Sequence, residues 1–297
     1  MTLEQLRIFV EVAHREHLTQ AASALALTPS AVSASIRVLE ERYGTPLFNR
    51  VGRRIELSEA GRLFLPEARI TLASARTAEL TLSELGGLQR GTLQIQASQT
   101  IASYWLPPLL VQFRQRYPQI ELNLTGGNTR QVAQAVADGA ADLGFIEGHI
   151  AQAELTIKEV DQDRIVVVVA PGHPWAGGQA LAADALLDGR WILREQGSGT
   201  RSAFEAILAQ AGIDTGRLDV ALTLPSNEAV RSAVMSGPFA TVVSELVVAA
   251  HLQAGLLRKV NLALPPRAFS LLRHRERYKS KASLALEQLI EARRNNG

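Results

Sequence analysis

The spacing of apolar residues in the first 58 positions predicts three short helices. The first has one apolar stripe, formed by Leu3, Leu6, Phe9 or Val10, and Ala13. After a polar break, we expect Thr19 to cap a second helix, whose small residues allow another helix to approach closely. Thr28 and Pro29 are typical of the start of a third helix, because proline loses no hydrogen bond at the first helical position. The apolar stripe of this third helix consists of Val32, Ile36 and Leu39.

Two short β-rich runs, 48–50 and 55–57, flank Gly52 and predict a β-hairpin. Two helices joined by a tight turn and followed by such a hairpin form a winged helix-turn-helix, whose second helix enters the major groove of DNA. The alternative is an ordinary helical subdomain, which the helix spacing alone does not exclude.

Polar residues of the third helix and of the hairpin are the candidate DNA contacts. They are Thr28, Ser30, Ser33, Arg37, Arg50, Arg53 and Arg54. Serine hydroxyls and alanine methyls suit thymine methyl groups and ambiguous hydrogen bonds better than bidentate base recognition. We therefore expect sequence preference to depend on DNA shape, with hairpin arginines in a narrow minor groove. A solvated turn is the alternative for Arg53 and Arg54.

A long helix is predicted from Ser58, its expected N-cap, to about Leu85. Its apolar positions keep close to a heptad spacing, and no glycine lies between Gly61 and Gly86. Pro66 is unfavourable, since proline inside a helix removes a hydrogen bond and costs up to about 3 kcal/mol. A long exposed helix needs a partner, so we expect two copies of the chain to pair along it as a homodimer.

From residue 91 on, short β-rich runs alternate with helical stretches, which predicts an α/β fold. The expected strands are 93–97, 120–124, 143–146, 165–170, 191–193, 220–224 and 240–243. Ser280 is expected to cap a final helix that packs on the first lobe of this fold.

A basic run occupies every second position near the C-terminus. It consists of Arg273, Arg275, Arg277, Lys279 and Lys281. On a strand these side chains share one face, so we expect a solvated edge strand that charge protects against aggregation. The alternative is a second face for DNA or for an acidic partner.

Similar loops in the two halves of the α/β part indicate an internal repeat. Ser98-Gln99-Thr100 and Ser198-Gly199-Thr200 each follow a predicted strand and open a helix. Asn128-Thr129 and Ser226-Asn227 also lie between strand and helix, and each begins eleven residues before a glycine.

Open α/β sheets bind ligands at the strand ends where such loops lie. Helix N-termini offer free N–H groups and a positive dipole end, so a small anion is the expected occupant. The alternative is that each polar residue only caps a helix. The candidate effector-binding residues are Ser98, Thr100, Asn128, Thr129, Ser198, Thr200 and Asn227. Glu147 is unusual beside an anion, and we expect it to cap a hinge or to bind a cationic group.

Composition limits the other possibilities. With 297 residues, 46% of them hydrophobic and 20% charged, the chain is a globular protein of about two domains. The net charge is only +2, and the first 58 residues contain seven arginines and six glutamates, so charge alone does not indicate nucleic acid.

Candidate catalytic and metal chemistry is sparse. Cysteine is absent, which excludes disulfides, thiolate zinc sites, iron–sulfur clusters and thiol nucleophiles. Among the histidines only His14 and His17 have helical ligand spacing, too few ligands for zinc, so we expect no metal and no cofactor. Without a nucleotide-binding or hydrolase motif, we expect no enzyme. A polar first segment and short apolar runs predict neither signal peptide nor membrane span, and therefore a cytoplasmic protein.

The run AASALALTPSAVSASIRVLEERYGTPLFNR (21–50), followed by SEAGR (58–62), resembles the N-terminal domain of LysR-type transcriptional regulators. The resemblance continues through the chain. ADLGFIEG (141–148) and WILREQGSGTR (191–201) are most similar to a bacterial subgroup associated with sulfite sensing.

This resemblance implies a two-lobed effector-binding domain similar to periplasmic binding proteins, with the inducer between the lobes. It assigns the ligand role most directly to Ser98 and Thr100, and then to Thr129, Ser198 and Thr200. It also implies a homotetramer built from dimers. Expected partners are double-stranded promoter DNA, a small anion with sulfite first, the chain itself and RNA polymerase.

The expected fold class is α/β, in three parts. A winged helix-turn-helix occupies 1–58, a linker (dimerisation) helix 59–90, and an effector-binding domain 91–297. Its lobe 1 comprises about 91–162 plus 268–297, and its lobe 2 about 163–267. The competing class is a solute-binding protein or small-molecule enzyme built on the same two-lobed domain.

Overall fold

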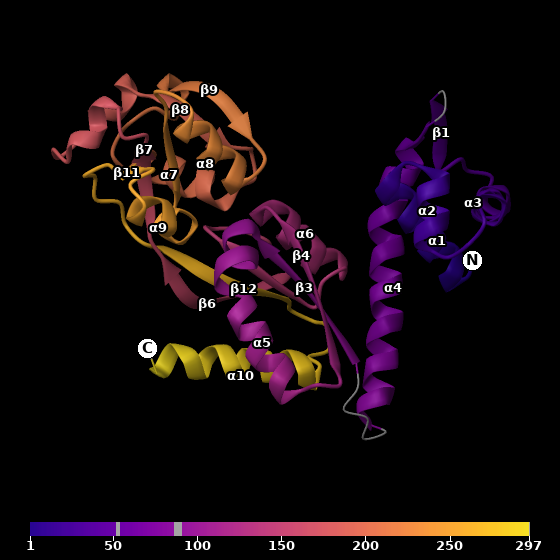
Figure 1. The fold of residues 1–297 in the computed structure, drawn as a ribbon. Coiled ribbons are helices and arrows are strands. Elements are labelled where there is room, and N and C mark those ends of the chain that lie inside the picture. The colour runs from indigo at the N-terminus through magenta and orange to yellow at the C-terminus, as the bar shows by residue number, and fades with distance from the viewer. Residues whose placement is uncertain (52–53, 86–90, 297) are drawn as a thin grey trace. The chain divides into compact units, whose positions relative to one another are not determined.

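The computed structural model describes residues 1–51, 54–85 and 91–296 of the chain (Figure 1). It contains two compact units, one built mainly from the residues up to the end of the long helix and one from the strand that follows onward. The expected end of the linker, 86–90, lies outside the described residues.

The first unit contains the three helices and the hairpin expected from the sequence, followed by the long helix. Its elements are α1 (Leu3–Arg15), α2 (Leu18–Ala24), α3 (Pro29–Tyr43), β1 (Phe48–Val51), β2 (Arg54–Leu57) and α4 (Glu59–Leu85). Thr28 caps α3 as predicted, because its Oγ1 accepts a hydrogen bond of 3.2 Å from the backbone N–H of Ala31. The expected Thr19 cap is wrong. α2 begins at Leu18, and His17, whose backbone is extended, accepts the capping hydrogen bond.

Aromatic rings form the centre of the first unit. Phe9 of α1 is fully buried, and its ring centroid lies 5.4 Å from that of Phe48 and 5.0 Å from that of Phe64. Glu40 of α3 accepts hydrogen bonds from the backbone N–H groups of Leu47 (2.7 Å) and Phe48 (3.1 Å). One carboxylate therefore fixes the start of the hairpin against α3.

Ser58 caps the long helix α4 as predicted. The Ser58 hydroxyl accepts a hydrogen bond of 3.0 Å from the Gly61 N–H and donates one of 2.7 Å to the Pro46 carbonyl. The helix has 27 residues and continues through Pro66. A proline near the start of a capped helix is thus accommodated without ending it.

The second unit is an α/β structure with two lobes, each built on one five-stranded sheet. The sheet of lobe 1 has the order β4-β3-β5-β12-β6, and that of lobe 2 the order β11-β7-β10-β8-β9. The elements of lobe 1 are β3 (Gly91–Ser98), the π-helix η1 (Ile101–Trp105), α5 (Pro107–Arg116), β4 (Ile120–Gly127), α6 (Thr129–Asp138), β5 (Leu143–Glu147), β6 (Leu155–Asp163), β12 (Arg267–His274) and α10 (Lys281–Asn296).

The elements of lobe 2 lie in the sequence between β6 and β12, the two strands of lobe 1 that lead into and out of lobe 2. They are β7 (Ile165–Val169), β8 (Arg190–Arg194), α7 (Gly199–Gln210), β9 (Asp219–Leu224), α8 (Asn227–Met235), β10 (Ala240–Ser244), α9 (Glu245–Gln253), β11 (Arg258–Lys259) and the short 3₁₀ helices η2 (Pro174–Gly177), η3 (Ala183–Asp188) and η4 (Thr215–Arg217). All seven strands expected from the sequence are present, whereas β6, β11 and β12 are not among the predicted strands.

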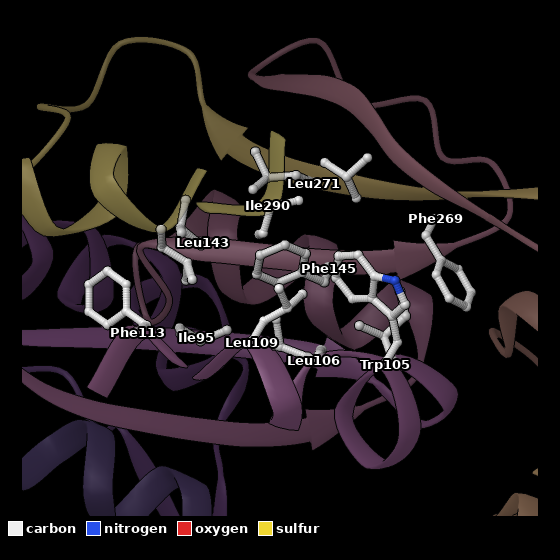
Figure 2. Close-up of a cluster of buried hydrophobic side chains, with 14 of the residues drawn as sticks. Ile95, Trp105, Leu106, Leu109, Phe113, Leu143, Phe145, Phe269, Leu271 and Ile290 are labelled. Atoms are coloured by element: carbon white, nitrogen blue, oxygen red, sulfur yellow. The ribbon is translucent and has the colours of Figure 1, made fainter. Parts of the chain in front are cut away.

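Each lobe has an aromatic core that fixes the strands leading to the loops between the lobes. Figure 2 shows the core of lobe 1, where the Trp105 ring lies 6.0 Å from Phe145 and 5.7 Å from Phe269, centroid to centroid. In lobe 2 the fully buried Trp191 of β8 lies 5.0 Å from Phe204 of α7. Burial of these large rings contributes to the stability of both cores.

The expected basic edge strand is wrong. β12 ends at His274 and lies between β5 and β6, so it is a central strand. Arg273 is only 6% exposed, and its buried charge is compensated by an ion pair with Glu287 and a hydrogen bond of 3.0 Å to Ser283, both on α10. The carboxylate that neutralises Arg273 comes from another element. The basic run alone therefore does not reveal that this arginine is buried.

The final helix agrees with the prediction. The Ser280 hydroxyl accepts a hydrogen bond of 3.2 Å from the Ser283 N–H at the start of α10, and Leu286 and Ile290 are buried in the core of lobe 1. Within the described ranges, no single helix is both long and apolar enough to cross a membrane; only α2 and α3 together, a bent pair, reach that length and composition.

Candidate functional site

The exposed side of α3 carries the helical DNA-contact candidates. Ser30 and Arg37 are exposed and Ser33 is half-buried. Thr28 is also exposed, with its Oγ1 3.0 Å from the Ser30 Oγ. Arg37 lies 3.7 Å from Glu41, but the two side chains are 70% and 68% exposed, so the ion pair is weak and Arg37 is free to meet a phosphate.

The hairpin carries the remaining candidates. Arg50 of β1 pairs in register with Ile55, and Arg54 of β2 pairs with Val51. Both arginines are exposed. Arg53, the third hairpin candidate, lies outside the described residues.

The effector-binding candidates are almost all buried where the two lobes meet. The exposed fractions are 1% for Ser98, 0% for Thr100, 4% for Thr129, 1% for Ser198, 0% for Thr200 and 1% for Asn227, and Asn128 is half-buried. Buried polar side chains need hydrogen-bond partners. Their partners show which of them the structure brings together.

Asn227 joins lobe 2 to the loop after β3 in lobe 1. Its Nδ2 donates a hydrogen bond of 3.2 Å to Thr100 Oγ1, and its backbone N–H donates one of 3.0 Å to Gln99 Oε1. Gln99 Nε2 in turn donates to the Pro225 carbonyl at 2.8 Å. The Ser98-Gln99-Thr100 loop of lobe 1 therefore contacts the Ser226-Asn227 loop of lobe 2 directly.

Asn128 forms a second bridge between the lobes. Its Nδ2 donates a hydrogen bond of 3.3 Å to Glu195 Oε1, while its Oδ1 accepts one of 3.0 Å from the Gln131 N–H. Asn128 thus caps α6 and reaches lobe 2 with the same side chain.

Thr129 and Thr200 both point to Glu147. The Thr129 hydroxyl donates to the Glu147 carbonyl at 2.8 Å, and the Thr200 hydroxyl donates to Glu147 Oε1 at 3.3 Å. Thr200 also accepts a hydrogen bond of 2.9 Å from Arg267. The hydroxyl of Thr200 therefore both donates and accepts a hydrogen bond within the protein, and that of Thr129 donates one.

Glu147 belongs to a buried ionic network at the two connections between the lobes. Arg267, at the start of β12, lies 3.3 Å from Glu147 and 2.6 Å from Asp163, which ends β6. The Ser244 hydroxyl donates a hydrogen bond of 2.6 Å to Asp163. Burial raises the pKa of the Asp163 carboxyl above its usual value, because the bonds from Arg267 and Ser244 offset the burial only in part. Glu147 thus binds a cationic side chain of the chain itself.

Ser98 and Ser198 differ from the other candidates. Each is 1% exposed, and neither Oγ atom has a hydrogen-bond partner among the described residues. They occupy equivalent places in the repeat, one at the end of β3 and one before α7. The structure therefore leaves one buried hydroxyl in each lobe able to bind something else.

Arg194 is a residue that the sequence analysis missed. It ends β8, is 2% exposed, and its Nη1 donates a hydrogen bond of 2.6 Å to Asn227 Oδ1. Its Nε and Nη2 donate to the two carboxylate oxygens of Glu195, at 2.8 and 2.9 Å. Burial raises the pKa of Glu195, but the bonds and charge of Arg194 outweigh burial, so the pKa lies below its usual value.

A signal for Arg194 was present in the sequence. A charged residue ends the apolar strand that runs directly into Ser198-Gly199-Thr200, and buried arginines need an anionic partner. Arg201, in contrast, pairs with Glu205 at 2.7 Å and donates to the Arg194 carbonyl, so its charge is satisfied within lobe 2.

Two family descriptions match the chain. Residues 3–62 match bacterial regulatory helix-turn-helix proteins of the lysR family, and residues 86–295 match the LysR substrate binding domain. A relative from Escherichia coli strain K12, the "Uncharacterized HTH-type transcriptional regulator YeiE", is 38% identical over 284 residues, which cover 95% of this chain and 94% of the relative.

Solved structures show the same fold. Full-length CbnR in complex with its target DNA superposes with a TM-score of 0.68 at 21% identity, covering 99% of both chains. The regulatory domain of CcmR from Synechocystis PCC6803, in complex with 2-PG, has a TM-score of 0.64 at 27% identity and covers 70% of this chain and 99% of that domain.

These matches confirm the family resemblance carried by 21–50 and 58–62, and they extend it over nearly the whole chain. The named relative is described as a transcriptional regulator. The chain therefore belongs to the LysR family, as a DNA-binding transcriptional regulator with an N-terminal helix-turn-helix domain and a C-terminal effector-binding domain.

Proposed function

We propose that a small oxyanion binds between the two lobes of the effector-binding domain and controls DNA binding. The observation that supports this proposal is the pair of Ser98 and Ser198. Both hydroxyls are buried in equivalent loops and lack a hydrogen-bond partner among the described residues. Because buried polar groups without partners are rare, a ligand that accepts hydrogen bonds from both lobes explains why the two serines lie there.

An oxyanion suits the surroundings of the two serines. The loops lead into helix N-termini, whose free N–H groups and dipoles favour negative charge, and hydrogen bonds to an ionised acceptor are stronger than neutral ones. Sulfite is the first candidate because 141–148 and 191–201 resemble sulfite-sensing regulators, with sulfate or a short organic acid next. The 2-PG complex of the CcmR regulatory domain adds 2-PG as a further probe.

The proposed effector-binding residues have two roles. Ser98 and Ser198 contact the ligand, while the others hold the surrounding structure in place. The hydrogen bonds of Thr100, Asn128, Thr200 and Asn227 link the two lobes, and Thr129 fixes the Glu147 backbone within lobe 1. A ligand that prefers one arrangement of the lobes shifts the population toward it. Such a shift is how the effector would alter the DNA-bound regulator.

The remaining roles follow the division of the chain. We assign promoter DNA binding to 1–58, self-association to 59–90 and effector binding to 91–297. The proposed DNA contacts are Thr28, Ser30, Ser33, Arg37, Arg50, Arg53 and Arg54. Further proposed partners are a second copy of the chain, as homodimer or homotetramer, and RNA polymerase.

Calorimetry tests the effector site. The full chain is titrated with sulfite, sulfate, thiosulfate and 2-PG, beside Ser98→Ala, Ser198→Ala and the control Ser236→Ala, whose exposed hydroxyl bonds only within α8. We expect at least one anion to bind, and each of the first two variants to weaken it by about 1.5 to 3 kcal/mol. If no oxyanion binds at millimolar concentration, the proposal is wrong. If Ser98→Ala and Ser198→Ala bind as the control does, the site lies elsewhere.

A further inference from the structure

Arg194 holds a buried positive charge beside the proposed effector site. It is 2% exposed, and its Nη1 bonds to Asn227 at 2.6 Å, while Asn227 bonds to Thr100 of the other lobe at 3.2 Å. Building on the proposed function, we propose that Arg194 is the cationic anchor of the effector. In the ligand-free chain the Glu195 carboxylate takes the effector's place on Arg194, and the effector must displace it.

The geometry of the Arg194–Glu195 pair is that of a bound oxyanion. Nε and Nη2 donate to two different oxygens of the same carboxylate, at 2.8 and 2.9 Å. A guanidinium binds carboxylates, sulfur oxyanions and phosphates through two such parallel hydrogen bonds. The ligand class is therefore an anion that presents two neighbouring acceptor oxygens.

The difference in burial between Arg194 and Glu195 determines which of the two can leave the pair. The Arg194 side chain is 2% exposed and that of Glu195 is 26% exposed, so Glu195 can move into water while Arg194 cannot. A buried charge that loses its partner is strongly unfavourable. An uncharged ligand would leave Arg194 unpaired, and only an anion can replace Glu195.

Displacement of Glu195 would also change a contact with lobe 1. Glu195 Oε1 accepts the 3.3 Å hydrogen bond from Asn128 that bridges the lobes. When an effector binds Arg194 and displaces Glu195, the hydrogen bond between Asn128 and Glu195 breaks. The internal carboxylate thus sets the affinity for the effector and links its binding to the contact between the lobes.

Glu195→Gln tests the competition directly. Glutamine keeps the length of the side chain and an acceptor oxygen for Asn128, but it removes the negative charge that competes with the effector. We expect every anion that binds the wild-type chain to bind this variant about tenfold or more tightly in calorimetry. Arg194→Gln and the double variant Arg194→Gln/Glu195→Gln should both bind at least about tenfold more weakly than wild type.

Two variants serve as controls. Glu205→Gln removes the same charge from the comparable pair that Glu205 forms with Arg201 on α7, and it should leave anion affinity unchanged. Asn128→Ala removes the bridge between the lobes but keeps the Arg194–Glu195 pair. Thermal unfolding of each variant confirms that it is folded before it is titrated.

The outcomes separate this inference from the proposed function. If the wild type binds an oxyanion but Glu195→Gln binds it no more tightly than Glu205→Gln does, Glu195 does not compete and the inference is wrong. An equal gain in Asn128→Ala would also overturn it, because the gain would then come from the lost bridge. If neither the wild type nor Glu195→Gln binds any oxyanion, the proposed function itself fails.

Discussion

The hydroxyl groups at the junction of the lobes fall into two groups, which hydrogen-bond partners distinguish. Thr200 accepts from Arg267 and donates to Glu147, and Thr129 is bound to the Glu147 carbonyl. Ser98 and Ser198 have no such partner among the described residues. Removal of Thr200 would take one hydrogen-bond partner from buried Arg267 and Glu147, and removal of Thr129 would take the donor from the buried Glu147 carbonyl, whereas removal of either serine hydroxyl breaks no hydrogen bond among the described residues. Hydroxyl side chains in neighbouring loops therefore differ in their contacts, and the proposed binding role rests on the two serines.

Gly199 of lobe 2 lies close to the backbone of lobe 1. A Cβ added there would meet the Glu147 carbonyl oxygen and the Thr129 hydroxyl, and a backbone oxygen cannot move aside. We expect Gly199→Ala to lower the free energy of unfolding by about 1 to 3 kcal/mol. It should also weaken oxyanion binding, because it moves the Ser198 loop away from lobe 1.

Urea unfolding and calorimetry measure these two effects. Gly126→Ala is the matched control, since a Cβ at Gly126 has no heavy atom within 4 Å. We expect that control to stay within about 0.5 kcal/mol of the wild type. Equal stability of the two variants would show that the close approach at Gly199 has no energetic consequence.

At the scale of elements, the apolar pattern predicts those helices and strands whose burial follows their own sequence. The run IVVVV of β7 and the capped helices α3 and α4 are of this kind. β12 is not, since its buried arginines, Arg267 and Arg273, look like surface residues until partners from β6 and α10 are known. β11, with two residues, is too short to carry a pattern.

The same limit applies to the candidate site. The Ser-x-Thr loops are visible because the repeat places them at two equivalent strand ends. Arg194 and Glu195 are neighbours in sequence, but their role depends on Asn227 and Asn128, which lie more than thirty positions away. Contacts of that kind arise from the packing of the lobes, and no local pattern encodes them.

The ionic network at the lobe connections predicts a pH dependence of stability. Burial raises the pKa of Asp163 in the folded chain, despite Arg267, and Glu147 adds to the effect. A raised pKa means that the folded state holds this proton more tightly than the unfolded state. The stabilisation is complete below the unfolded pKa of about 3.9 and is lost as the pH rises through the higher folded value.

Comparison with Asp163→Asn isolates this contribution. The variant cannot ionise, so the free energy of unfolding of the wild type relative to the variant should fall as the pH rises from about 4. Urea unfolding of both proteins over a series of pH values measures the difference. A difference that grows with pH would show that the pKa of Asp163 is lowered in the folded chain, contrary to the expectation.

The hairpin is the element for which DNA binding makes a quantitative prediction. If exposed Arg54 contacts a phosphate, Arg54→Ala should weaken binding to all sequences alike and reduce the salt dependence of log affinity by about 1. The same result is expected for Arg53→Ala. Arg116→Ala removes an exposed arginine from the other unit and is the control.

Fluorescence anisotropy with a DNA fragment from the chain's own upstream region, at several salt concentrations, provides the slopes. An unchanged slope in Arg54→Ala would remove that arginine from the DNA interface.

At the scale of the whole molecule, α4 exposes apolar side chains that a single chain leaves in water. Leu63 is 73% exposed and Ile70 is 38% exposed, and their spacing of seven places them on one side of the helix. A second copy of α4 would cover these side chains by the heptad pattern that the sequence shows. Such pairing would also present two helix-turn-helix domains to one DNA molecule, as regulators with two half-sites require.

Ile70→Lys tests this assembly. A lysine in the seam between two helices would be buried without a partner, so we expect the dissociation constant of the dimer to rise at least about tenfold, or about 1.4 kcal/mol. Glu79→Lys introduces the same side chain at an exposed position half a helical circumference away and should leave the dimer intact. Sedimentation at several concentrations compares the three proteins. If the wild type is a monomer at micromolar concentration, or if both lysine variants dissociate alike, the seam does not run along the side marked by Leu63 and Ile70.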